Sequence, residues 1–128
     1  MNIDNLTFDV IGAAMEVHSV LGPGLLESLY QRALAQELKL RGHSVILERP
    51  IEVFYKGEKI SDNLKADLFV DDELVVELKS VESLNPIHFK QTTSYLHLLN
   101  KPIGLLINFN VVSLRDGVSR VVNPYYRK

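Results

Sequence analysis

The sequence predicts one domain that combines α-helices with a β-sheet, and three observations carry this prediction. Apolar residues recur at helical spacing in three segments, at about residues 5–20, 25–41 and 86–99. Between the second and third segments, apolar and polar residues alternate as in strands, above all in residues 65–79. Residues 103–109 form a compact apolar run, as expected for a strand covered on both faces. Because 128 residues with 46% apolar and 23% charged side chains suit one ordinary domain, we expect a single α/β domain over residues 1–128.

Composition narrows the classes of function. No apolar run approaches the roughly 20 residues that span a bilayer. The N-terminus carries Asp4 and Asp9 and no early basic cluster, so we expect no signal peptide, no membrane partner and a cytoplasmic location. The absence of cysteine excludes disulfides and thiolate metal sites, and the four histidines lack the HExxH spacing of a zinc site. A net charge of −2 argues against a broad basic surface for nucleic acid, so any polyanion must be held locally.

Two helices are predicted before the strands. The first begins at about Asn5 or Thr7, either of which could cap it, and runs through Val20. Glycine and proline at residues 22–24 end it, and a second helix follows over about residues 25–41, with Gly42 placed as its C-terminal cap. Glu27 lies in the first turn of this second helix, where the helix dipole favours a carboxylate. On position alone, Glu27 is either such a surface residue or part of a site.

The middle of the chain is rich in predicted strands. Residues 44–48 and 51–55 read as strands interrupted at Arg49-Pro50, and Lys56-Gly57-Glu58 reads as a turn. Asp62-Asn63 is expected to interrupt the strand structure again before the hairpin of residues 65–79. Residues 103–109 should form a central strand, and residues 118–122 could add an edge strand.

The hairpin of residues 65–79 has a register that its sequence selects. Apolar residues alternate along Ala66, Leu68 and Val70 and again along Leu74, Val76 and Leu78. A three-residue turn at residues 71–73 pairs Val70 with Leu74 and sets Asp67 opposite Glu77, whereas a two-residue turn would mix apolar and charged faces. One face of the hairpin then carries Lys65, Asp67, Phe69, Val75, Glu77 and Lys79.

Two carboxylates and an ammonium thus converge on one face. Residues directly opposite in an antiparallel pair have Cβ atoms about 4.5 to 5.5 Å apart, so Asp67 and Glu77 repel each other unless a cation lies between them. Oxygen ligands with room for water suit magnesium or manganese, and Lys79 could contact an attacking water or a phosphate. The alternative from the residues alone is an ion-pair cluster of Asp67, Glu77 and Lys79 on a solvated face of the sheet.

A third helix is predicted from Asn85-Pro86 to about Leu99, with Asn as cap and Pro at the first position. Its expected core stripe is Phe89, Thr92, Leu96 and Leu99. Gln91 and Tyr95 are four residues apart and therefore stack on a neighbouring stripe. They could reach a phosphate backbone or orient a catalytic group, or they could be ordinary helix surface.

Taken together, these motifs resemble the GxxExxY family, a branch of the PD-(D/E)XK nuclease-like superfamily. The signature corresponds to LGPGLLESLY at residues 21–30. The other motifs follow in the family's order: His18, Tyr55-Lys56-Gly57, the hairpin from Asp67 to Lys79, Gln91 with Tyr95, and GLLINF at residues 104–109. The resemblance covers nearly the whole chain. It departs at Ala66, where the superfamily pattern has Pro.

The resemblance implies a fold and a site. The fold is a restriction-endonuclease-like αβββαβ core, a mixed sheet flanked by helices. Asp67 would be the first acidic strand residue, Glu77 and Lys79 the E-x-K pair, and Glu27 an additional helical glutamate. Gln91 and Tyr95 resemble a Q-x-x-x-Y helix motif near the same site.

Two hypotheses for function follow. The first is a deoxyribonuclease dependent on Mg²⁺, or on Mn²⁺, in which Asp67, Glu77 and Glu27 hold the metal and Lys79 assists the attacking water or the transition state. Gln91 and Tyr95 would position the DNA strand or the lysine. The second is a binding module for nucleic acid or protein that keeps the nuclease fold without turnover. The small size and the lack of a basic surface favour the second, or a homodimer or partner protein that supplies the grip on DNA.

Overall fold

A five-stranded mixed sheet organises the chain. The computed structural model describes residues 1–128, and its strands follow the order β1-β2-β3-β4-β5 across the sheet. Neighbouring strands are antiparallel except β3 and β4, which are parallel. The strands are β1 (Val45–Tyr55), β2 (Glu58–Val70), β3 (Leu74–Lys79), β4 (Ile103–Asn108) and β5 (Val118–Val122). The α/β fold with a mixed sheet is confirmed, and so are the central position of β4 and the edge strand β5.

Three α-helices flank this sheet: α1 (Ile3–Leu21), α2 (Glu27–Leu40) and α3 (Pro86–Leu99). Helix α3 begins and ends as predicted, with Asn85 as its N-terminal cap. Helix α1 begins earlier than predicted, because Asn2 is the cap and its Oδ1 accepts a hydrogen bond from the Asn5 N–H at 2.8 Å. The two caps proposed from the sequence, Asn5 and Thr7, therefore lie inside α1. No helix is long and apolar enough to cross a membrane.

The hairpin between β2 and β3 has the predicted register. Val70 pairs with Leu74 and Leu68 pairs with Val76 across a three-residue turn. Asp71 and Asp72 take positive φ angles of 52° and 57° in this turn, a conformation that aspartate tolerates better than most residues. One residue further this register would set Asp67 opposite Glu77, as predicted, but the pairing of β2 with β3 ends at Leu68 and Val76.

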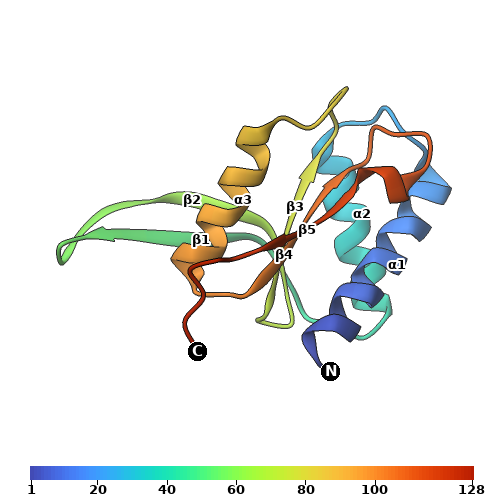
Figure 1. Cartoon of the computed structure of the whole chain (residues 1–128). Coiled ribbons are helices and arrows are strands. Elements are labelled where there is room, and N and C mark those ends of the chain that lie inside the picture. The colour runs from blue at the N-terminus through green and yellow to red at the C-terminus, as the bar shows by residue number, and fades with distance from the viewer.

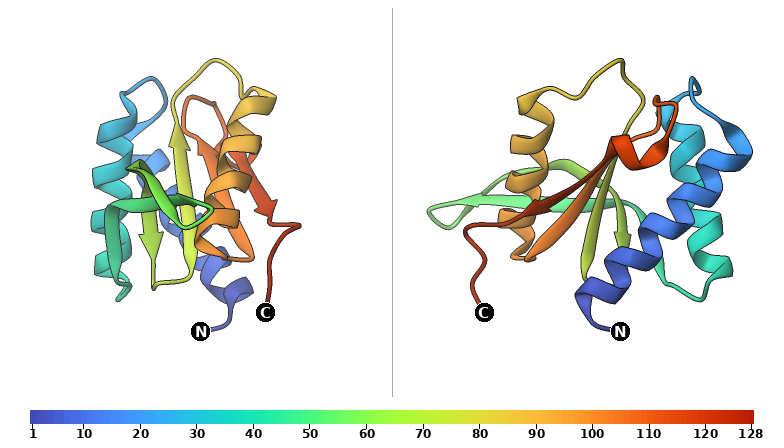
Figure 2. Two further views of the ribbon diagram at one scale, coloured as in Figure 1. Left: turned by 90° about the vertical axis from the view of Figure 1, so that its left-hand side faces the viewer. Right: turned by 45° about the vertical axis from the view of Figure 1, so that its right-hand side comes forward.

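The two faces of the sheet are covered by different helices, as Figure 1 and Figure 2 show: α1 and α2 lie on one face and α3 on the other. The larger core lies beneath α1 and α2, where Leu68, Val70 and Val76 pack with the helices. The smaller core lies beneath α3 and includes Phe69 and Val75. The alternation read from the sequence therefore assigns these side chains to the correct faces.

Ala66 is an exception to this alternation. It packs in the core beneath α3 with Phe69, although the sequence pattern grouped it with Leu68. The pairing of β2 with β3 ends at Leu68 and Val76, and beyond this point β2 stays with β1 alone. The pleat that the sequence pattern assumed does not continue past the point where the strands part.

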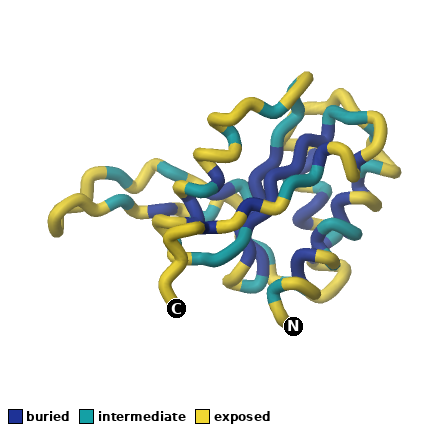
Figure 3. The backbone as a smooth tube through the Cα atoms, in the orientation of Figure 1, coloured by how far each residue is buried: buried dark blue, intermediate teal, exposed yellow.

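Beyond that point β1 and β2 form a long two-stranded ribbon that projects from the body (Figure 1), and Figure 3 shows that most of it is exposed. The predicted turn at Lys56-Gly57 is confirmed, with φ angles of 48° and 87°. The predicted interruptions at Arg49-Pro50 and Asp62-Asn63 are wrong, because both lie inside continuous strands. Pro50 is tolerated because β1 is an edge strand, and register shifts near Val53 absorb the irregularity opposite residues 61–64.

The side chains with which helix α3 packs against the sheet differ in part from the predicted core stripe. Thr92 and Leu96 are buried and Leu99 packs against the core, but Phe89 is exposed. Tyr95, which the sequence placed on a polar stripe, is 7% exposed and belongs to the core. The helix thus turns Tyr95 toward the sheet, on the side where Glu77 lies.

Candidate active site

Asp67 and Glu77 are linked by two hydrogen bonds between side chain and backbone. The Asp67 N–H donates to Glu77 Oε2 at 2.6 Å, and the Leu78 N–H donates to Asp67 Oδ2 at 2.8 Å. These bonds form where β2 separates from β3, so each carboxylate takes a backbone donor that a regular ladder would pair with a carbonyl. The two carboxylates are held together by the backbone of the opposite strand.

Burial raises the pKa of both acids. Glu77 is 5% exposed, and its burial followed by the charge of Asp67 raises its pKa from 4.5 to about 8. Burial also raises the pKa of Asp67, while the hydrogen bond from Leu78 and the charge of Lys79 oppose the rise. Such shifts arise where carboxylates lack enough positive charge around them, and a bound cation would reverse them.

Lys79 lies two residues beyond Glu77 at the end of β3 and is half-buried. Its positive charge lowers the pKa of both Asp67 and Glu77. The Lys79 carbonyl accepts a hydrogen bond from the Phe109 N–H at 2.9 Å, which fixes the end of β3 against β4. Lys79 is therefore close enough for its charge to act on both carboxylates, and its part in a site stays a prediction.

Glu27 comes to the same place from a distant part of the chain. It is the first residue of α2, and its Oε2 lies 3.4 Å from the backbone nitrogen of Ser80, the residue after Lys79. Its charge contributes to the raised pKa of Asp67 and of Glu77. No group of three or more His, Cys, Asp and Glu side chains is gathered closely enough to hold a metal ion. Glu27 therefore borders the carboxylate pair, and its role as a metal ligand stays a prediction.

The Gly-x-x-Glu-x-x-Tyr segment explains how Glu27 is placed. The Tyr30 hydroxyl donates to the Gly22 carbonyl at 2.5 Å and accepts from the Leu25 N–H at 3.1 Å. The Tyr30 ring stacks on Phe109 at 4.4 Å between centroids. The Ser80 hydroxyl donates to the Leu25 carbonyl at 2.6 Å. The tyrosine thus fastens the loop before α2 to the sheet, and the loop presents Glu27 at the end of β3.

Tyr95 approaches the pair from α3. Its pKa is raised by burial first and then by the charges of Glu77 and Asp67, while a side-chain hydrogen bond with Gln91 opposes the rise. Gln91 is exposed one helical turn before Tyr95. The structure therefore brings Tyr95 close to the carboxylates and leaves Gln91 at the surface beside it.

Three further residues, Ser28, Gln31 and Glu48, border the site, and the sequence did not point to them. A cavity of about 210 Å³ is lined by Glu27, Ser28, Gln31, Glu48, Asp67 and Leu78. Gln31 could have been found, because it follows Glu27 by four residues and so shares its helix face. No sequence motif pointed to Glu48, which lies within β1 with a φ of 52° and whose charge raises the pKa of Asp67.

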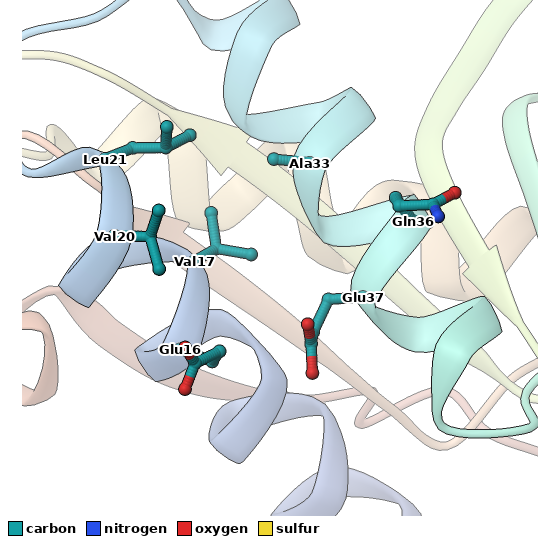
Figure 4. A pocket seen from close by; sticks show the side chains of 7 residues that line it. All are labelled: Glu16, Val17, Val20, Leu21, Ala33, Gln36 and Glu37. Atoms are coloured by element: carbon teal, nitrogen blue, oxygen red, sulfur yellow. The ribbon is translucent and has the colours of Figure 1, made fainter.

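A second pocket, of about 220 Å³, lies between α1 and α2 (Figure 4). Its walls are mainly apolar, with Val17, Val20 and Ala33 facing one another and Glu16 and Glu37 at its margin. It contains none of the residues around the carboxylate pair. This pocket is therefore separate from the cavity beside the carboxylate pair.

Comparison with known families agrees with this geometry. Residues 4–121 match the family model described as the PD-(D/E)XK nuclease superfamily. No curated protein and no solved structure matches the chain. The match spans the sheet, all three helices and the acidic pair with its lysine. The chain belongs to the PD-(D/E)XK nuclease superfamily.

Proposed function

We propose that this protein is a metal-dependent nuclease that hydrolyses phosphodiester bonds of DNA. The observation that carries the proposal is the hydrogen-bonded pair of buried Glu77 and partly buried Asp67 beside Lys79, within a chain whose superfamily consists mainly of nucleases. The pair has raised pKa values and lies next to a cavity. These are the properties of a site that handles charge on a substrate rather than of a stabilising surface cluster.

The donor chemistry of Asp67 and Glu77 suits a divalent cation, although no third His, Cys, Asp or Glu side chain is gathered closely enough to complete a group of three. Both acids offer oxygen ligands only, the donor set that Mg²⁺ and Mn²⁺ prefer, and a cation would offset the repulsion between the two charges. Members of this superfamily generally use divalent metals, and we propose Mg²⁺, with Mn²⁺ as a substitute, at Asp67 and Glu77, with Glu27 beside them. When bound, such a metal activates water and stabilises negative charge on a phosphate.

The remaining side chains have supporting roles in this proposal. The Lys79 ammonium can donate hydrogen bonds to a phosphate oxygen or to the attacking water, and its charge stabilises an oxyanion. Tyr95 and Gln91 lie on the α3 side of the pair and can orient Lys79 or the DNA strand. With a net charge of −2, the chain offers DNA only local contacts. A homodimer or a partner protein would add further contacts to DNA. A cytoplasmic location stays a prediction.

A non-catalytic binding module is the second candidate, and the projecting ribbon favours it. Phe54, Tyr55 and Ile60 are each about 60% exposed there (60%, 61% and 62%) and belong to no core. Exposed apolar side chains gathered on one element are typical of contact surfaces. Measuring the molar mass in solution with and without DNA would show whether this ribbon is used for assembly.

One experiment separates enzyme from binder. Labelled single- and double-stranded DNA is incubated with Mn²⁺ and the wild type, Lys79→Met or the control Lys39→Met, which changes an exposed lysine on α2. Because Lys79 acts mainly in the transition state, Lys79→Met should abolish cleavage. The affinity for DNA, measured in Ca²⁺, should fall only by the amount expected for the loss of one phosphate contact. A wild type without metal-dependent cleavage would favour the binding module. Equal cleavage by wild type and Lys79→Met would reject the proposed role of the lysine.

A further inference from the structure

Gln31 makes a contact to the acidic pair that neither the sequence motifs nor the proposed chemistry uses. Its side-chain Nε2 donates a hydrogen bond to the backbone carbonyl of Asp67 at 2.9 Å. Gln31 lies in α2, one helical turn after Glu27, and both side chains line the same cavity. One face of α2 therefore places the Glu27 carboxylate at the site and the Gln31 amide against the backbone of Asp67.

The backbone of Asp67 needs partners from outside the sheet ladder. The pairing of β2 with β3 begins only at the next residue, Leu68, which pairs with Val76. On the β1 side the register runs from Leu47 with Leu68 to Arg49 with Ala66 and leaves Asp67 unpaired. The residue between them on β1, Glu48, has a positive φ of 52°. Asp67 therefore lies at a gap in the sheet, where side chains replace backbone partners.

Two side chains fill this gap. Glu77 accepts from the Asp67 N–H, and Gln31 donates to the Asp67 carbonyl. The first bond ties Asp67 to β3, and the second ties it to α2. The bond from Gln31 is thus the hydrogen bond that joins the Asp67 backbone to the helix that carries Glu27.

We propose that Gln31 is a positioning residue that sets Asp67 against Glu27 and so tunes the affinity of the site for a divalent cation. The proposal rests on the proposed function, since it takes Asp67 as a ligand of the cation. Gln31 itself touches neither metal nor DNA. It acts through the Asp67 backbone, in the way that outer hydrogen bonds orient the ligands of metal sites.

The test is calorimetric titration of the full chain with Mn²⁺. Gln31→Leu removes the donor at nearly the same side-chain size, and we expect it to weaken Mn²⁺ binding about tenfold, the lower end of what loss of an outer hydrogen bond costs metal sites. The matched control is Gln36→Leu, an exposed position on the same helix, which should bind Mn²⁺ like the wild type. If Gln31→Leu does not fold, Gln31→Met serves in its place.

A double-mutant cycle distinguishes positioning from general destabilisation. If Gln31 acts by setting Asp67 against Glu27, the loss of Mn²⁺ affinity caused by Glu27→Gln should be smaller in the Gln31→Leu background than in the wild type. Additive losses, or a Gln31→Leu variant that binds like the wild type, overturn the role of Gln31 while leaving the nuclease proposal standing. A wild type that binds no Mn²⁺ overturns both.

Discussion

Asp67 and Glu77 lie on opposite strands, and the Glu77 carboxylate accepts a hydrogen bond from the Asp67 N–H at 2.6 Å. This contact occurs at the residue where β2 leaves β3. Glu77 is also withdrawn from solvent, so burial and then the charge of Asp67 raise its pKa, while the hydrogen bond from the Asp67 N–H opposes the rise. The geometry that holds the pair together thus also makes it electrostatically costly without a cation.

The first prediction concerns metal binding at Asp67. Mn²⁺ or Mg²⁺ should raise the melting temperature of the wild type, because a ligand that binds only the folded state stabilises it, by about 2.7 kcal/mol at 100 times its Kd. Asp67→Asn should lose most of this shift, and the control Asp116→Asn, at an exposed position outside the site, should retain it. Thermal melts at increasing metal concentration measure both. An unchanged response in Asp67→Asn would show that Asp67 is no ligand.

The second prediction tests whether Glu27 belongs to the site. Removing one charge from a repulsive group should leave the metal-free protein as stable as before, or more stable, and should weaken Mn²⁺ binding. Chemical denaturation and calorimetry of Glu27→Gln measure the two effects. If Glu27 were only favoured by the helix dipole, Glu27→Gln would instead cost at most about 1 kcal/mol of stability and leave metal affinity intact.

The third prediction is a pH dependence that originates in Glu77. The unfolded chain releases the Glu77 proton near the ordinary glutamate pKa of 4.5, whereas the folded, metal-free protein retains it up to a pKa of about 8. Between these values the folded state binds more protons, so the free energy of unfolding should fall as the pH rises. Glu77→Gln should remove much of this fall, which denaturation at several pH values would reveal. A wild type whose stability does not fall over this range would contradict the raised pKa.

The same titration should couple to the metal. Since a cation binds the deprotonated pair, Mn²⁺ affinity should increase as the pH rises toward 8, and binding should release a proton. Calorimetry in buffers of different ionisation enthalpy counts that proton. Binding without proton release near neutral pH would mean that the pair is already ionised in the metal-free protein.

The fourth prediction concerns His43, which bridges α1 and the turn of the β2–β3 hairpin. Its Nδ1 lies 2.6 Å from Asp71 Oδ2, and its Nε2 contacts the Asp9 carboxylate. Burial lowers the pKa of His43, but the hydrogen bonds to Asp9 and Asp71 outweigh it and raise that pKa above 6.5. The protonated imidazole therefore acts as a clamp between two carboxylates.

The sign of the effect follows from the raised pKa. The stability that His43 contributes is fully present below its unfolded pKa of about 6.5 and is lost as the pH rises through the higher folded pKa. His43→Gln should therefore destabilise the protein most below pH 6.5 and least at alkaline pH, as thermal melts across this range would show. His97→Gln, at an exposed histidine of α3, is the control. A His43→Gln deficit that is constant with pH would mean that the clamp works through packing and not through charge.

Much of the fold follows from local patterns in the sequence. The start of helix α3 is predictable because Asn85 and Pro86 are a cap and a first helical residue, and the register of the β2–β3 hairpin is predictable because a slip of one residue would turn Leu68 and Val76 toward the wrong face. Asp67 and Glu77 are the next residues beyond the last pair of that register, so it brings them close together. For this reason the centre of the site could be predicted from the sequence alone.

Other features depend on contacts between distant segments. Pro50 and Asn63 were predicted to interrupt the strands. The pairing of β1 with β2 instead keeps both strands continuous at these residues. Ala66 lies on the other face from the one predicted because β2 separates from β3 near this residue. The alternation of apolar and polar residues in the sequence does not show where two strands separate.

The surroundings of the carboxylates were likewise decided by tertiary structure. Gln31 and Glu48 reach Asp67 only because α2 packs beside β2 and β1 pairs with it. The sequence by itself determined which residues form the acidic pair, since strand periodicity acts over neighbouring residues. Only the folded chain decided which side chains satisfy the backbone of Asp67, because that depends on where the strands separate and which helix covers the gap.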